Sequence, residues 1–161
     1  MNDHAVASFL EPVLERLCKY AGVELHAYYN ETVEDEVTAR LRAHFTSWNS
    51  VALLSDPALA GLIVGQRIDI LIDLSGPTGL NRLRAFAGKP APIQVSWLGY
   101  PGTTGLRAMD YFLGDSHWLP PGQFDRYFVE KLVYLPAAAV FQPEPGAPED
   151  GGPQQGEHRD H

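Results

Sequence analysis

Residues 68–115 read IDILIDLSGPTGLNRLRAFAGKPAPIQVSWLGYPGTTGLRAMDYFLGD, and this stretch decides the fold. It opens with an apolar, β-branched run at 68–74, which is typical of a strand covered on both faces in a parallel sheet. A second apolar run follows at 92–98, and residues 78–87 between them place apolar side chains at roughly helical spacing. Strand, helix and strand predict a βαβ unit with a right-handed crossover.

A glycine-rich loop follows each of these two strands. The first loop is SGPTG at 75–79, and the second is GYPGTTG at 99–105. Open α/β sheets bind ligands at the carboxyl ends of their strands. We therefore expect the two loops to lie side by side and to mark the candidate site.

The rest of the chain continues the alternation of helices and strands. Periodicity and turn residues predict helices at 5–20, 33–45 and 55–66, and strands at 23–29, 48–51, 108–113 and 127–135. The fold class is therefore α/β, a Rossmann-like, mostly parallel sheet with flanking helices. A doubly wound sheet usually starts with a strand, whereas this chain starts at a helix, so we expect the first strand to be missing. Proline, glycine and acidic residues dominate late in the chain and predict a disordered tail at 142–161 after a domain at 1–141.

Composition excludes several classes of partner. A net charge of -8 without a Lys/Arg cluster argues against nucleic-acid binding. A single cysteine, Cys18, excludes an intrachain disulfide and fits a reducing compartment, and its helical context predicts a core or boundary position. No apolar run approaches the ~20 residues that span a bilayer. We therefore expect a cytoplasmic protein with no membrane partner.

Three features carry candidate chemistry, and each has a structural alternative. His4 lies in the first turn of a predicted helix, where the helix dipole favours a neutral imidazole that can act as a base. The alternative is a disordered histidine at the chain terminus, which the residue spacing alone favours. Residues 76–79 could present backbone N–H groups to an anion. The alternative is a tight turn without a ligand, and the residue types of this segment favour the turn. The aromatic and threonine residues of the segment 97–105 suit a surface that binds a sugar or a nucleotide. The alternative is that Trp97 and Tyr100 pack in the core. The other histidines lack ligand-like spacing, so we expect no metal site.

The phrase KPAPIQVSWLGYPGTTG at 89–105 resembles the catalytic region of protein O-linked N-acetylglucosamine (O-GlcNAc) transferases, particularly the bacterial members. The similarity continues in residues 3–12, 68–76, 109–111 and 127–136. It covers about residues 2–142, which is nearly all of the part expected to be structured.

The resemblance implies the N-terminal lobe of a two-lobed (GT-B) glycosyltransferase. Such enzymes transfer N-acetylglucosamine from UDP-GlcNAc to Ser or Thr hydroxyls of proteins, with inversion and without a metal or other cofactor. In this reading His4 matches the cleft histidine that acts as a general base or orients the acceptor. The implied substrate-binding residues are Thr78, Gly99, Tyr100, Pro101, Gly102, Thr103 and Thr104.

The resemblance also implies that most UDP contacts belong to a second, C-terminal lobe, which this sequence does not contain. The isolated chain is therefore expected to be inactive. Two alternatives stay open at this point: a non-catalytic binding remnant, and a different sugar-nucleotide-binding Rossmann-like module.

Overall fold

The computed structural model describes residues 3–139, and the side chains from Val6 onward. The elements in chain order are α1 (Asp3–Leu17), β1 (His26–Tyr29), α2 (Glu36–Arg42), β2 (Ser47–Ser50), α3 (Asp56–Gly65), β3 (Ile70–Asp73), α4 (Leu83–Ala87), β4 (Ile93–Trp97), β5 (Tyr111–Asp115), the 3-10 helix η1 (Asp125–Tyr127) and β6 (Lys131–Leu135). Every predicted helix and strand is confirmed, with ends that differ by a few residues. The predicted tail at 142–161 lies outside the described residues.

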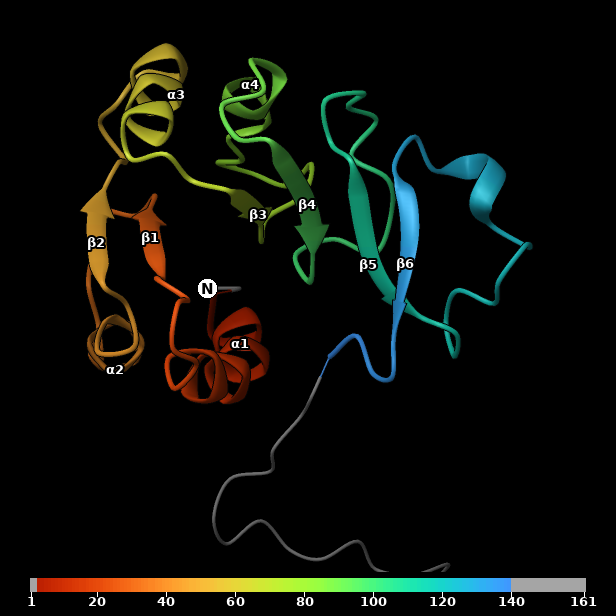
Figure 1. The fold of residues 1–161 in the computed structure, drawn as a ribbon, viewed down its shortest axis with the longest axis horizontal. Coiled ribbons are helices and arrows are strands. Elements are labelled where there is room, and N and C mark those ends of the chain that lie inside the picture. The colour runs from red at the N-terminus through yellow and green to blue at the C-terminus, as the bar shows by residue number, and fades with distance from the viewer. Residues whose placement is uncertain (1–2, 140–161) are drawn as a thin grey trace, which may run out of the picture.

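The strands form a central layer between helices. Helices α3 and α4 lie on one side of the strands, and α1 and α2 lie on the other (Figure 1). All strand pairs are parallel, in one sheet of order β1-β2 and one of order β3-β4-β5-β6. In the predicted βαβ unit, β3 pairs with β4 through the register Ile70↔Ile93. The α/β class with a parallel sheet and flanking helices is therefore confirmed.

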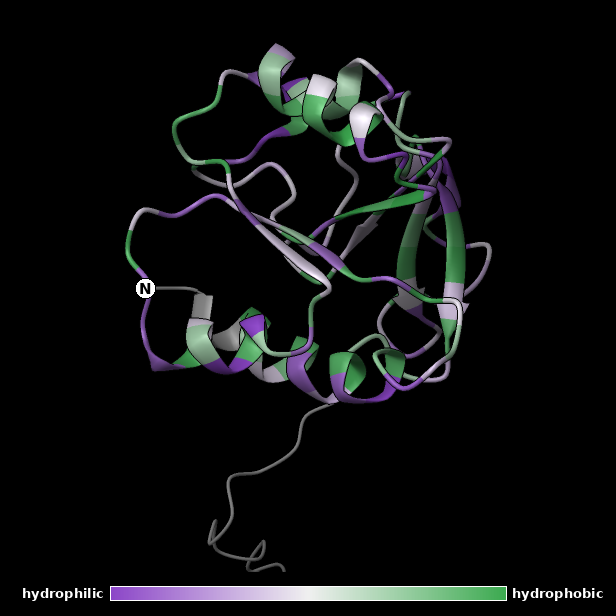
Figure 2. Ribbon diagram, turned by 60° about the vertical axis from the view of Figure 1, so that its left-hand side comes forward, coloured by the Kyte–Doolittle hydropathy of each residue, from purple (hydrophilic) through white to green (hydrophobic). Residues whose placement is uncertain are grey.

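Local sequence explains where the helices begin. Asp35 caps α2 by accepting a hydrogen bond from the Thr38 N–H, and Ser55 caps α3 in the same way. Helix α4 begins at Leu83 and not at residue 78, because Leu80 adopts a left-handed φ of 59° that breaks the helical path. Figure 2 shows polar and apolar stretches alternating along the helices, as expected for elements with one face on a core. Among residues 3–139, no helix is both long and apolar enough to cross a membrane.

The main core joins α3 and α4 to the sheet. Its buried members come from α3, β3 and α4 and from the residues just after β2 and just before β4 and β5: Val51, Leu59, Ile63, Leu71, Ala85, Phe86, Ala91 and Met109. Because this cluster includes residues just after β2 and residues of β3, it packs the two sheets against the same pair of helices. In the described part of the chain no strand pairing joins the two sheets, and this side-chain packing holds them together.

The prediction that β3 is buried on both faces is wrong. Leu71 and Asp73 are buried, whereas Ile70 and Ile72 are 54% and 44% exposed. The physical reason is that, among residues 3–139, β3 pairs with β4 alone, and an open cavity lies beside its other edge. The expected core or boundary position of Cys18 is also wrong, because this side chain is exposed just beyond the end of α1.

Candidate functional site

The loops that follow β3 and β4 contact each other at two glycines. Gly76 has a φ of 59°, and a Cβ at this position would lie 2.5 Å from the Tyr100 Cβ. A Cβ on Gly99 would lie 2.1 Å from the carbonyl oxygen of Leu74. Neither contact is sterically possible, so only glycine allows the two backbones to approach this closely. The predicted proximity of the two glycine-rich loops is confirmed.

The loop after β3 turns around a buried carboxylate. Asp73 accepts hydrogen bonds from the backbone N–H groups of Ser75 and Gly76, at N···O distances of 3.1 and 2.8 Å. Burial raises the pKa of Asp73 above its ordinary value, and the two N–H groups act in the opposite direction. The Thr78 hydroxyl donates to the Ser75 carbonyl at 2.9 Å. These contacts are those of a tight turn, and they use the first N–H groups of the loop internally.

The loop after β4 is held by Glu130, whose side chain is buried. The Thr103 hydroxyl donates to one carboxylate oxygen at 2.7 Å, and the Thr104 N–H donates to the other at 2.8 Å. The Thr104 hydroxyl donates to the same carboxylate. The Gly105 N–H in turn donates to the Thr103 hydroxyl oxygen. Charge-assisted hydrogen bonds of this kind fix the loop to the segment that precedes β6.

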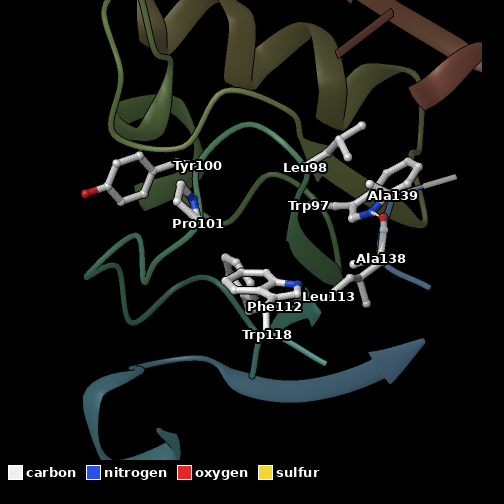
Figure 3. A pocket seen from close by; sticks show the side chains of 9 residues that line it. All are labelled: Trp97, Leu98, Tyr100, Pro101, Phe112, Leu113, Trp118, Ala138 and Ala139. Atoms are coloured by element: carbon white, nitrogen blue, oxygen red, sulfur yellow. Dashed lines mark hydrogen bonds between the residues drawn. The ribbon is translucent and has the colours of Figure 1, made fainter. Parts of the chain in front are cut away.

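A small cavity of about 160 Å³ lies next to this loop (Figure 3). It is lined by Trp97, Leu98, Tyr100, Pro101, Phe112, Leu113, Trp118, Ala138 and Ala139. Trp97 is buried, and its Nε1–H donates to the Ala138 carbonyl at 2.7 Å, so this side chain packs the core. Tyr100 is 42% exposed, and its ring extends away from Trp97 (Figure 3). The two aromatic residues of the motif therefore differ: one is structural and the other faces solvent.

A second carboxylate at the strand ends shapes the wall of this cavity. Asp115, the last residue of β5, accepts from the N–H groups of Ala138, His117 and Trp118 at 2.9, 2.9 and 3.3 Å. The hydrogen bond from Ala138, together with those from the other two residues, holds the pKa of Asp115 below its ordinary value. The segment after β6 is thereby anchored to the end of β5.

The structure brings most of the predicted site residues to one edge of the sheet. Residues 99–104 form one continuous loop, and Thr78 is exposed in the neighbouring loop. The backbone of His4 lies in the first turn of α1, as predicted, but its side chain lies outside the described part of the chain. Among the side chains that are described, no group of three or more His, Cys, Asp or Glu residues is arranged to hold a metal ion.

Sequence reasoning missed Glu130. Glu130 directly precedes a strand, and nothing in the sequence pattern distinguishes it from a charged side chain exposed to solvent. Its partners are 26 and 27 residues away in the sequence, so only the tertiary fold reveals the pairing. The one available signal was the pair of adjacent hydroxyls at Thr103 and Thr104, which need acceptors if the loop is ordered.

The sequence pattern of glycosyl transferase family 41 matches residues 10–142. The chain belongs to this family. It is 34% identical over 149 residues, or 89% of its length, to the rice (Oryza sativa subsp. japonica) "Probable UDP-N-acetylglucosamine--peptide N-acetylglucosaminyltransferase SPINDLY". The Arabidopsis thaliana protein SEC, which carries the same enzyme name, is 41% identical over 97 residues, or 60% of this chain.

A solved structure agrees with the family assignment. The K341M mutant of Thermobaculum terrenum O-GlcNAc transferase superposes with a TM-score of 0.83 at 44% identity, over 89% of this chain. The resemblance to the catalytic region of O-GlcNAc transferases is thus confirmed. This family 41 chain spans only part of these proteins: 16% of rice SPINDLY, 10% of SEC and 27% of the Thermobaculum chain.

Proposed function

We propose that this chain is one lobe of a protein O-GlcNAc transferase, an enzyme that moves N-acetylglucosamine from UDP-GlcNAc to Ser or Thr hydroxyls of proteins. The observation that carries the proposal is the likeness, over nearly the whole described chain, to the Thermobaculum O-GlcNAc transferase in both sequence and fold. The named relatives act on peptides with a UDP-sugar donor, so a protein acceptor and a nucleotide-sugar donor are the partners proposed here.

Within that function, the loop at 99–104 lines the substrate side of the sheet. Tyr100 and Pro101 are exposed and are proposed to face the sugar or the acceptor, together with Gly99 and Gly102 of the same loop. Thr103 and Thr104 hold the loop in place, because both of their hydroxyls donate to a buried carboxylate. Thr78 borders the same edge from the neighbouring loop.

His4 is the proposed general base or acceptor-orienting group. Its backbone lies in the first turn of α1, and an imidazole is the side chain that most often serves as a general base. Its proposed step is to accept the proton of the acceptor hydroxyl as that oxygen bonds to the anomeric carbon and UDP leaves.

The isolated chain is proposed to be inactive. Pockets that enclose small ligands measure about 300–1,000 Å³, whereas the cavity at the strand ends measures about 160 Å³. This edge of the sheet is therefore proposed to form only one wall of the site that binds the UDP-sugar donor. The same observation favours the second candidate function, a lobe that docks to a partner without turnover of its own.

A chimera tests the proposal. The segment of Thermobaculum O-GlcNAc transferase that matches this chain is replaced by the chain itself, and transfer from UDP-GlcNAc to a Ser/Thr peptide is measured. We expect transfer by the chimera, and neither transfer nor detectable UDP binding by the isolated chain. A folded chimera without transfer would contradict the transferase proposal. Micromolar UDP binding by the isolated chain, about -8 kcal/mol, would contradict the proposed need for a second lobe.

The role of His4 is tested in the same chimera. His4→Ala is expected to lower kcat at least about 100-fold, which is the lower range for loss of a general base. His44→Ala is the matched control, because His44 is half-buried beyond the end of α2 and outside the two loops. If the two substitutions lower transfer equally, His4 has no role in the chemistry.

A further inference from the structure

The small cavity beside the loop at 99–104 has the size of a single apolar side chain. It measures about 160 Å³, which is well below the roughly 300–1,000 Å³ of pockets that enclose whole small ligands. An apolar cavity of roughly 150 Å³ is large enough to hold benzene. We name this cavity, which is lined by the residues drawn in Figure 3, the aromatic cavity.

The walls of the aromatic cavity are apolar and come from the ends of two strands. Phe112 of β5 is buried and forms an edge-to-face pair with Trp118, with ring centroids 6.1 Å apart. Trp97, the last residue of β4, is also buried. Leu98 and Leu113 add aliphatic surface to the lining. Such walls offer an occupant apolar contact on several sides.

The polar groups around the aromatic cavity are largely committed to one another. None of the lining residues carries a charged side chain. The Trp97 indole N–H donates to the Ala138 carbonyl at 2.7 Å, and the Ala138 N–H donates to Asp115 at 2.9 Å. The Tyr100 hydroxyl lies on the far side of its ring from the other lining residues (Figure 3). A sugar ring or a nucleobase would leave most of its polar groups without partners here, which is unfavourable, so the cavity suits an apolar occupant.

The loop that is proposed to face the substrate forms the mouth of the aromatic cavity. Tyr100 and Pro101 belong to that loop, line the cavity and are exposed. Directly before the loop, Leu98 has a φ of 75°, and the Gly99 N–H donates to the Trp97 carbonyl at 2.9 Å. A γ-turn with a positive φ is rare and strained, and such strain persists where the surrounding structure fixes it, often at binding sites. The turn ties the position of the mouth to the wall of the cavity.

We propose that the aromatic cavity binds one apolar side chain of the polypeptide acceptor, close in sequence to the Ser or Thr that receives the sugar. This inference rests on the proposed function, because that function brings a polypeptide to the loop at 99–104. A polypeptide can insert a single apolar side chain while its backbone stays outside the cavity. UDP-GlcNAc, in contrast, carries polar groups on every ring. The cavity thereby selects acceptors by sequence.

N-acetyl-L-phenylalaninamide is the probe for the cavity itself. It is titrated into the chain, and the indole N–H signals of the three tryptophans are followed by heteronuclear NMR. We expect saturable shifts of the Trp97 and Trp118 signals, because both side chains line the cavity. Trp48 does not line it and is the internal control, which is expected not to shift. N-acetyl-L-glutaminamide, which has no apolar ring, is expected to shift none of the three signals.

The transfer assay on the chimera tests the role in acceptor choice. The acceptor peptides contain a single Ser in a background of glycine and alanine. Each peptide carries Phe at one position near the Ser and is compared with the peptide that carries Gln at the same position. Because the burial of a large apolar side chain is favourable, we expect one position at which Phe raises kcat/KM about tenfold or more over Gln.

Two matched variants locate the effect. Ala139→Leu fills the cavity from its mouth, because Ala139 is exposed and lines it. This substitution is expected to abolish both the probe shifts and the preference for Phe. Ala137→Leu is the control, since Ala137 is also exposed but does not line the cavity. It is expected to retain the probe shifts and the preference.

The outcomes separate this inference from the proposed function. Transfer by the chimera without a Phe preference at any position, or with a preference that Ala139→Leu leaves unchanged, overturns the inference and leaves the proposed function standing. A folded chimera without transfer contradicts both. The inference also fails if the probe gives no saturable shift, or if N-acetylglucosamine or UDP displaces it, because the cavity then belongs to the donor. A dimer in sedimentation that Ala139→Leu disrupts would make the cavity an interface between copies and would likewise overturn the inference.

Discussion

Replacing Glu130 tests the claim that a single carboxylate holds the substrate-facing loop. Glu130→Ala removes the acceptor of three hydrogen bonds, from the Thr103 hydroxyl and from the N–H and hydroxyl of Thr104. A hydrogen bond to a charged group contributes about 1.5–3 kcal/mol. The three bonds share one carboxylate and the threonines are partly exposed, so we expect a total loss of about 3 kcal/mol and not the full sum. For a chain of this size, that loss lowers Tm by about 6–12 °C.

The assay is urea unfolding followed by far-ultraviolet circular dichroism. Glu34→Ala is the control, because Glu34 forms an exposed ion pair with Arg42 that contributes at most about 1 kcal/mol. A double-mutant cycle of Glu130→Ala with Thr103→Val should give an interaction energy of at least about 0.5 kcal/mol. The reasoning is refuted if Glu130→Ala costs no more than Glu34→Ala, or if the two substitutions in the cycle are additive.

Three further predictions follow from the same contacts. Gly99→Ala places a Cβ 2.1 Å from a carbonyl oxygen and should cost about 1–3 kcal/mol or more in urea unfolding, whereas Gly61→Ala, in open space within α3, should stabilise by about 0.5–1 kcal/mol. The pKa of Asp115 is lowered in the folded state, so the ionised side chain stabilises the fold above its ordinary pKa of about 3.9. This stabilisation is lost as the pH falls through the pKa of the folded state. Asp115→Asn should therefore lower Tm at pH 7 and reduce the fall of Tm in acid. Arg82 donates to four acceptors in three segments, so Arg82→Lys should lower Tm by several degrees, and the exposed Arg84→Lys should leave it unchanged.

Most of the fold follows from the sequence because its signals are local. The apolar runs at 68–74 and 92–98 predict β3 and β4, and the cap at Ser55 with its following proline predicts α3. Helix α4 is shorter than its periodicity indicates, because the left-handed φ of Leu80 delays its start. Helix propensity is judged over a window of residues, so it does not reveal a left-handed conformation at a single position.

The parts that sequence reasoning missed are tertiary. The exposure of Ile70 and Ile72 depends on whether a neighbouring strand is present, which the apolar pattern of β3 does not encode. The same holds for Glu130, whose burial depends on a loop 26 residues earlier in the chain. The adjacency of the two glycine-rich loops was predictable, because the topology of a parallel sheet places them at one edge.

The interruption between β1 and β3 has a consequence for how the molecule opens. Hydrogen bonds run continuously across β3, β4, β5 and β6, whereas within residues 3–139 no such ladder connects them with β1 and β2. Side-chain packing around α3 and α4 couples the two parts, together with the hydrogen bonds that Asn30 and Arg82 form between the segments after β1 and β3. Amide hydrogens of β1 and β2 should therefore exchange with solvent through a partial opening of lower free energy than those of β4 and β5. The molecule then comprises two cooperative units, and the unit with the two-stranded sheet unfolds first.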